Sequence, residues 1–356
     1  MLATLPPERF GPARQPHFRR RQGREQGLVT VCTQLTVDRL DRLAMMAQNY
    51  GGPISAVLYI GFRANGTEQL HAERVAAARA WNSSVHMQKY VDLHLVMDHK
   101  QPWLRMGDQT EGHANNPYPV NLLRQLSIMY ATTDYVLYLE ADMITRPSMH
   151  KHIAKSWSEM LSKDQENNWK AVFVVPLYNA PPAGPWNGNV MATDLASRVP
   201  SSKKKLQEDL ADVGSTGLIR MGDQYTSHRQ LDYDRWEKMS AGAFMPYGDT
   251  KGQEPYFIMR KAVMPVYDVL YWGISGDKIE QVEEVQKEGF QFLLHPDLWA
   301  VHFDSVGLGD SWLVDSRRMT WRANFVRMMH ELTAATRVPA WTDGKMPEMI
   351  QGPSAS

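Results

Sequence analysis

The segment YVLYLEAD, residues 135–142, joins an apolar run directly to two carboxylates. Residues 135–139 are apolar throughout, which is typical of a strand buried on both faces. Glu140 and Asp142 follow at a spacing of i, i+2, and the small Ala141 permits a tight turn in which both face one ion. Mg²⁺ and Mn²⁺ prefer such carboxylate oxygens. The segment therefore predicts a strand that ends in a divalent-cation site, with a pair of solvated loop carboxylates as the alternative.

The strand pattern recurs along the chain, with helical segments between the copies. The other predicted strands up to this point and just beyond are residues 28–33, 54–60, 92–97 and 171–175. The predicted helices are residues 36–50, 68–80, 119–130 and 147–161. This alternation predicts an α/β fold with a mixed, mostly parallel central sheet flanked by helices. Ligands of such sheets bind beyond the carboxyl ends of the strands, where Glu140 and Asp142 are expected.

The domain organisation follows from changes in composition. Residues 1–27 are rich in Pro, Gly, Gln and Arg, which predicts a disordered basic arm. We expect one domain over residues 28–335, followed by a C-terminal tail at 336–356. Within it, residues 179–242 are expected to form a long, partly mobile insertion over the site, because long loops in compact domains are usually functional or disordered. The later predicted elements are strands at 254–259 and 299–303 and a helix at 311–334.

Composition restricts the partners. The 356 residues carry 39 basic and 39 acidic side chains, so no net field favours nucleic acid or an anionic membrane. The single cysteine, Cys32, excludes an intrachain disulfide and is expected to be a buried thiol. No run of apolar residues is long enough to span a bilayer, so we expect a soluble chain or one that lacks an upstream anchor. Two glycosylation acceptor tripeptides begin at Asn65 and Asn82.

Two later regions add candidate site residues. His302 ends the predicted strand at 299–303, so the same sheet edge could bring this imidazole to the ion, although a satisfied core histidine is an equal alternative. The segment GISGDK, residues 273–278, places glycines beside Asp277 and Lys278. Glycine allows the backbone to approach a sugar closely, while Asp277 or Glu254 could act as a general base. An ordinary turn with Asp277 as a helix cap explains that composition equally well.

In this order, these regions resemble glycosyltransferase family 49, which includes the β-1,4-glucuronyltransferase of dystroglycan glycans and the second catalytic domain of the LARGE enzymes. The resemblance covers roughly residues 28–335, the 179–242 insertion excepted. It rests on residues 29–40, 52–59, 118–124 with 140–142, 254–256 and 267–278.

The resemblance implies a GT-A fold, a UDP-sugar donor, Mn²⁺ (with Mg²⁺ as an alternative) and inversion at the anomeric carbon. Glu140 and Asp142 match the family's D-x-D motif, and His302 matches its late metal-ligand histidine. Asn121 and Arg124 match the helix beside the donor, where a guanidinium suits a diphosphate or a uronate. The family also implies protein glycosylation in the Golgi or the secretory-pathway lumen.

The chain departs from the family pattern around the sugar. The family's Gly-Phe-Gly-Trp-Asn-Lys is GISGDK here, so that only Gly273 and Lys278 are kept and the flanking aromatic is missing. The first metal acid is Glu140 instead of Asp. The sequence thus predicts a Mn²⁺-dependent inverting glycosyltransferase, with glucuronate as the candidate sugar and a glycan or glycoside hydroxyl as acceptor. The alternatives are a catalytically inactive glycan- or partner-binding relative and a nucleotide-diphosphate-sugar hydrolase. Oligomeric state is left open.

Overall fold

The first half of the large sheet is parallel, as predicted. The computed structural model describes residue 19 and residues 28–60, 67–97, 119–180, 192–240, 242–268 and 277–303. Its first four strands pair in the order β3-β2-β1-β4, all parallel. They are β1 (Val29–Leu35), β2 (Ile54–Ile60), β3 (Val91–Met97) and β4 (Tyr135–Tyr138). The bounds of each strand lie within two residues of the predicted ones. Mainly apolar runs flanked by glycine or polar residues leave little choice of where a strand begins and ends.

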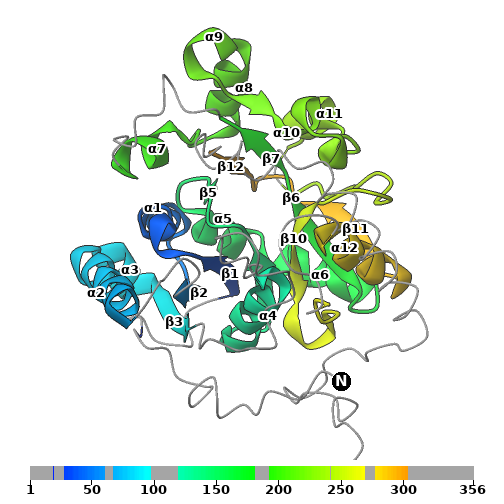
Figure 1. Ribbon diagram of the computed structural model, residues 1–356. Coiled ribbons are helices and arrows are strands. Elements are labelled where there is room, and N and C mark those ends of the chain that lie inside the picture. Colours follow the sequence, from blue (N-terminus) through cyan, green and yellow to red (C-terminus); the bar gives the residue numbers. More distant parts are fainter. Residues whose placement is uncertain are drawn as a thin grey trace, which may run out of the picture.

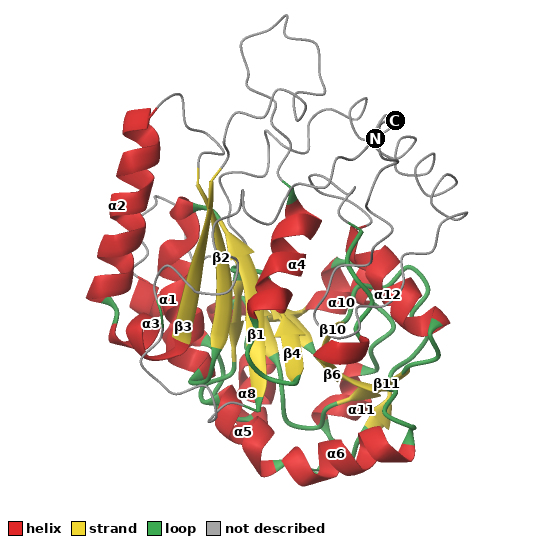
Figure 2. Cartoon of the chain, turned by 90° about the horizontal axis from the view of Figure 1, so that it is seen from below, coloured by secondary structure: helices red, strands yellow, loops and turns green. Residues whose placement is uncertain are grey.

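Helices cover both faces of this half. They are η3 (Val37–Arg39), α1 (Leu40–Tyr50), α2 (Thr67–Ser83), α3 (Val85–Tyr90) and α4 (Val120–Tyr130). Alternate residues of β2 point to opposite sides: Val57 and Tyr59 pack with the α4 side chains Leu123 and Leu126, whereas the residues between them join the main core with α1. In Figure 2, α4 lies over the sheet, and α1, α2 and α3 gather beside β3. The predicted α/β class is confirmed.

The second half of the sheet is mixed. From β4 the order continues β10-β6-β11-β9. β10 runs antiparallel to both β4 and β6, β11 runs parallel to β6, and β9 runs antiparallel to β11. The bounds are β6 (Ala171–Val175), β9 (Met245–Pro246), β10 (Tyr256–Arg260) and β11 (Gln291–Leu294). The two predicted strands at 171–175 and 254–259 are therefore present, and β9 and β11 were not predicted.

A second sheet lies beside the large one (Figure 1). Its order is β5-β12-β7-β8, formed by β5 (Met143–Thr145), β12 (Ala300–His302), β7 (Leu177–Asn179) and β8 (Ile219–Arg220). β12 is the predicted strand at 299–303, but its partners were not predicted. In this register His302 lies opposite Met143 on one side and Asn179 on the other. The sheet therefore joins the end of β12 to the chain that follows Asp142.

The remaining helices surround the second half. They are α5 (Met149–Lys155), α6 (Trp157–Glu166), α7 (Ala192–Arg198), α8 (Lys203–Ala211), α9 (Val213–Thr216), α10 (Met221–Gln224), η5 (Thr226–His228), α11 (Tyr233–Glu237), η6 (Lys261–Val263) and α12 (Asp277–Lys287). The helix predicted at 147–161 is thus two helices, α5 and α6. Residues 192–240 of the predicted insertion form helices α7 to α11 and bury Leu206 and Trp236 completely.

The buried core accounts for the prediction about the single cysteine. Cys32 is fully buried in β1, and this burial raises the pKa of its thiol far above the ordinary value. It is therefore the inert buried thiol that was expected. No helix in the described ranges is long and apolar enough to cross a membrane. The predicted basic arm, apart from residue 19, and the predicted helix at 311–334 lie outside the described residues.

Candidate active site

Glu140 is the centre of a charged cluster at the end of β4. Its Oε1 atom lies 3.1 Å from a guanidinium nitrogen of Arg124 and 3.3 Å from the Nζ atom of Lys278. Burial by itself would raise the pKa of Glu140, but attraction from Lys278, Arg124 and His302 outweighs it and lowers the pKa to about 2. The carboxylate is therefore ionised at physiological pH and held between two cations.

Lys278 connects Glu140 to two further side chains, those of Glu254 and Tyr256. Its Nζ atom lies 3.1 Å from Oε2 of Glu254 and donates to the hydroxyl of Tyr256 at 3.0 Å. Burial disfavours the ammonium form, yet the nearby Glu140, Tyr256 and Glu254 raise the pKa of Lys278 well above the ordinary value. Three predicted site residues are thus brought into contact, because the ammonium of Lys278, whose side chain is 21% exposed, lies between the carboxylates of Glu140 and Glu254.

The helix α4 supplies Asn121 and Arg124, as predicted. Arg124 is only 2% exposed and donates to Oδ1 of Asn121 at 2.8 Å, while the Asn121 amide donates to the carbonyl of Asp268 at 2.8 Å. The guanidinium also lies 5.0 Å from the ring centre of Tyr138. Arg124 is therefore fixed by hydrogen bonds and a cation–π contact, and it faces the Glu140 carboxylate.

Asp142 belongs to the same edge but has a different cation. Its Oδ1 atom lies 2.6 Å from a guanidinium nitrogen of Arg39, which ends the short helix η3 after β1. The Asp142 carbonyl accepts a hydrogen bond from the Phe303 amide at 3.1 Å. Because Phe303 follows His302, this bond places the predicted histidine next to the segment that carries the two acids.

His302 makes one side-chain hydrogen bond, from its Nδ1 atom to Oδ1 of Asn179 at 3.0 Å. It is also close enough to Glu140 to lower the pKa of that carboxyl. Within the described ranges, however, no three His, Cys, Asp or Glu side chains already converge on one point as metal ligands. Arg39, Arg124 and Lys278 occupy the carboxylates of Glu140 and Asp142 instead.

Two predicted residues are only partly covered by the structure. Gly273 lies outside the described residues. Asp277 begins helix α12, one position before Lys278, in agreement with a helix start, but its side chain is not among those described. The assignments of Asp277 as base and of Gly273 as a sugar contact remain predictions.

Four site residues were not predicted from the sequence: Arg39, Asn179, His228 and Tyr256. Of these four, Arg39 was the easiest to predict from the sequence, because it follows the predicted strand β1 and therefore lies at the same sheet edge. His228 is buried and stacks on Tyr256 with ring centres 6.4 Å apart. Burial, reinforced by the charge of Lys278, lowers the pKa of His228 to about 3, so this imidazole is neutral. Its position depends on the fold of residues 192–240, which no local sequence pattern revealed.

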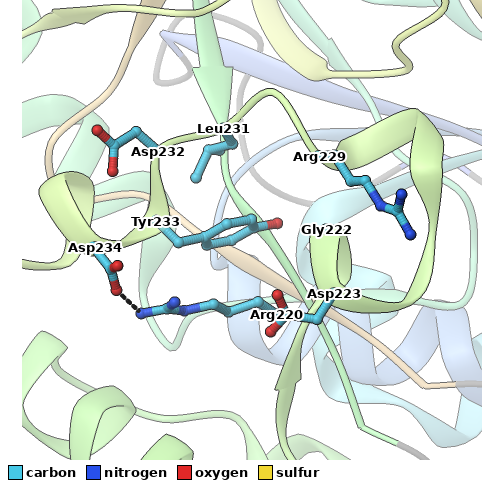
Figure 3. A pocket seen from close by; sticks show the side chains of 8 residues that line it. All are labelled: Arg220, Gly222, Asp223, Arg229, Leu231, Asp232, Tyr233 and Asp234. Atoms are coloured by element: carbon cyan, nitrogen blue, oxygen red, sulfur yellow. Dashed lines mark hydrogen bonds and ion pairs between the residues drawn. The ribbon is translucent and has the colours of Figure 1, made fainter.

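A cavity of about 490 Å³ lies beside this region, between β8, α10 and α11. Figure 3 shows Arg220 paired with Asp234 along its floor, and the Tyr233 ring above it. The same arginine binds Glu237, and the Tyr233 hydroxyl donates to the Leu177 carbonyl at 2.7 Å. These contacts hold α11 against β7 and β8. They account for Arg220, Tyr233 and Asp234 in its lining, and we assign the cavity no ligand.

The fold and this edge define a class of protein. A sheet covered on both faces, with carboxylates and cations beyond its strand ends, belongs to the α/β proteins that bind their ligands at that edge. More particularly, the chain belongs to the glycosyltransferase family whose model is described as "Glycosyl-transferase for dystroglycan", which matches residues 28–308. The family resemblance inferred from the sequence is thereby confirmed. Family and architecture together confirm the GT-A fold.

Curated relatives agree with the family. The chain is 27% identical over 278 residues to "Glycosyltransferase-like protein gnt14" of Dictyostelium discoideum, covering 78% of this chain and 37% of that protein. It is 24% identical over 275 residues to the mouse "Xylosyl- and glucuronyltransferase LARGE2" (77% and 34%) and 26% identical over 280 residues to human LARGE1 (77% and 31%). The chain thus spans about a third of the length of these relatives.

Solved structures with a similar chain path include "GalNAc-T7 with UDP, GalNAc and Mn2+". That match has a TM-score of 0.40 and 12% identity, and covers 80% of this chain and 45% of the other. A second is S. aureus TarS 1–349 in complex with UDP, with a TM-score of 0.37, 10% identity, and coverage of 78% and 60%.

Proposed function

We propose that this chain is a Mn²⁺-dependent, inverting glycosyltransferase that moves a sugar from a UDP-sugar to a hydroxyl of a glycan or glycoside. Family membership supports the reaction class. The observation that carries the proposal is the Glu140 carboxylate at the end of β4, ionised and held between Arg124 and Lys278. At such an edge the carboxylate can bind a metal cation, and the neighbouring basic side chains can bind the anionic leaving group.

The candidate metal-ligand atoms suit a hard or borderline divalent cation. Glu140 and Asp142 offer carboxylate oxygens, and His302 offers an imidazole nitrogen, which suits Mn²⁺ better than Mg²⁺. These three residues would hold the ion after the carboxylates exchange part of their contact with Arg39, Arg124 and Lys278. A bound cation would neutralise the negative charge that develops on the diphosphate as the sugar leaves.

The cations at this edge suit the donor. Once the carboxylates turn to a metal ion, Lys278 and Arg39 become available for diphosphate oxygens, while Arg124 stays fixed by Asn121 and Tyr138. Glucuronate is the first sugar to test, because LARGE relatives are named xylosyl- and glucuronyltransferases. Xylose is the second for the same reason.

Inversion requires a base on the side of the acceptor. The acceptor oxygen forms its bond to the anomeric carbon as the bond to the diphosphate oxygen breaks, and UDP leaves with that electron pair. The hydroxyl proton passes to a carboxylate, for which Asp277 is our first candidate and Glu254 our second. Glu254 lies 3.1 Å from Lys278, which places its carboxyl group inside the charged cluster.

A donor screen tests the proposal. Purified chain is incubated with Mn²⁺ and a panel of UDP-sugars, with and without acceptor glycosides, and UDP release is measured. We expect release with one sugar that rises when an acceptor is added and stops when the metal is chelated. Release that ignores acceptors would favour a nucleotide-diphosphate-sugar hydrolase. UDP binding without release from any donor would favour an inactive binding relative.

We extend the proposal to a secretory-pathway location, as expected from the family. The acceptor asparagine Asn82 is exposed near the end of α2, so it is accessible to glycosylation in that compartment. Expression in animal cells followed by glycosidase treatment should lower the apparent mass, and Asn82→Gln should reduce that change. An unchanged mass would count against this location.

A further inference from the structure

Asn179 is a buried polar residue that meets His302 across the second sheet. It ends β7, is 1% exposed and lies opposite His302 in the parallel pairing of β7 with β12. Its Oδ1 atom is 3.0 Å from Nδ1 of His302. On its other side, the Asn179 amide nitrogen donates to Oε1 of Gln224 in helix α10. One asparagine thus connects the histidine to the helical region at 192–240.

The hydrogen-bonded series His302–Asn179–Gln224, called the relay below, fixes the position of a proton on the imidazole. An amide oxygen can only accept a hydrogen bond, so the His302 Nδ1 atom must carry the hydrogen. In a neutral imidazole the other nitrogen, Nε2, then has the free lone pair. Gln224 determines which end of the Asn179 amide faces the histidine, because its own Oε1 atom takes the amide hydrogen.

The relay is not needed to hold the two strands together. Backbone pairing already joins β7 to β12, and the Ala180 amide donates to the His302 carbonyl at 2.9 Å. Burying an asparagine without a need for it would be unfavourable, since its polar atoms lose water. A role in orienting the imidazole accounts for a hydrogen bond that the strand pairing does not require.

We propose that Asn179, oriented by Gln224, is a positioning residue that holds His302 in the Nδ1–H tautomer and presents its Nε2 atom to the divalent cation. The inference rests on the proposed function for the cation and goes beyond it by assigning the partner of the ligand. Histidines that bind metals commonly donate their second ring nitrogen to an oxygen acceptor, which fixes both tautomer and ring orientation.

Metal affinity tests the proposal without any activity measurement. Mn²⁺ binding in the presence of UDP is followed by the loss of the free-ion electron paramagnetic resonance signal. Asn179→Leu, which cannot accept the hydrogen bond, should weaken Mn²⁺ binding about 10- to 100-fold. Asn179→Asp should retain it, since a carboxylate also accepts. Gln224→Leu, at an exposed position, should weaken Mn²⁺ binding by a smaller factor.

The matched control is Tyr178→Phe. Tyr178 precedes Asn179 on β7, points to the other side of the strand, and loses a 3.2 Å hydrogen bond to Glu237 in this variant. Mn²⁺ affinity should stay unchanged. Wild-type affinity in both Asn179→Leu and Gln224→Leu would overturn the positioning role.

A metal-free experiment separates this inference from the proposed function. Nitrogen-15 spectra of labelled histidine, with His302→Gln used to assign the signal, should show the neutral His302 ring protonated at Nδ1. Asn179→Leu should shift the population toward the Nε2–H form. A ring protonated at Nε2 in the wild type would overturn the inference whether or not Mn²⁺ binds. Failure of the wild type to bind Mn²⁺, with the tautomer as expected, would contradict only the proposed cation.

Discussion

The two halves of the large sheet contribute differently to the site. The N-terminal half, strands β3-β2-β1-β4, is wholly parallel and supplies the carboxylates of Glu140 and Asp142 together with the cations of Arg39 and Arg124. The C-terminal half, strands β10-β6-β11-β9 with the second sheet and α12, is mixed and supplies Glu254, Lys278 and His302. The site lies where the halves meet, at β4 and β10.

This difference separates the anchoring of the site from its assembly. Each acid already has a cation within the N-terminal half: Asp142 has Arg39, and Glu140 has Arg124. The C-terminal half then adds Lys278 to Glu140 and the Phe303 amide to the Asp142 carbonyl. We infer that the N-terminal half supplies the two acids proposed to bind the metal, and that the C-terminal half supplies His302 and the two candidate bases. The predictions that follow remove one contribution at a time.

The largest effect is expected for the N-terminal half. Asp142→Ala removes a proposed metal-ligand oxygen and the 2.6 Å contact with Arg39, so UDP release should fall about 1,000-fold. Asp38→Asn is the matched control, because Asp38 also contacts Arg39, at 3.5 Å, but is 47% exposed and is not a proposed metal ligand. Mn²⁺-dependent UDP release measures both variants. Equal turnover of Asp142→Ala and wild type would show that the site is assigned wrongly.

The next effect belongs to the C-terminal half and identifies the base. Asp277→Asn should lower kcat about 100-fold while leaving Mn²⁺ and UDP affinity intact, because an amide cannot take the acceptor proton. Glu254→Gln should lower kcat less. A pH profile of kcat for each variant is the measurement. The reverse order of the two losses would make Glu254 the base and Asp277 a helix cap.

The halves also differ in how much of them the sequence predicted. β1 to β4 are runs of four to seven buried residues, and such runs specify strands by themselves. Strands β5, β7, β8 and β9 have only two or three residues, too short for any periodicity, and they exist because distant segments pair with them. Glu140, Lys278 and Arg124 were predicted individually, through motifs and resemblance. Their contacts, and the roles of Arg39 and Asn179, depend on tertiary packing.

A smaller effect is expected when the link between the halves is cut. Lys278→Met removes the ammonium shared by Glu140 and Glu254, so less positive charge offsets the repulsion between these carboxylates and the diphosphate. We expect the Kd of UDP to rise about 10-fold, measured by calorimetry with Mn²⁺. Lys287→Met is the control: it lies on the same helix, is exposed and pairs only locally with Glu284 at 2.8 Å. If both lysine variants bind UDP alike, Lys278 does not contact the donor.

The smallest effect concerns stability and appears only in acid. The pKa of Glu140 is lowered from 4.5 to about 2 in the folded chain, so its ion pairs stabilise the fold fully above about pH 4.5. This contribution, on the order of 1–3 kcal/mol, should disappear as the pH falls from about 5 to about 2. Urea unfolding across that range should therefore show the wild type losing its advantage over Glu140→Gln. The exposed Glu288, changed to Gln, should leave the difference from wild type constant. A constant difference for Glu140→Gln as well would mean that Arg124 and Lys278 do not hold this carboxylate in solution, and that the two halves meet at β4 and β10 without the charge cluster.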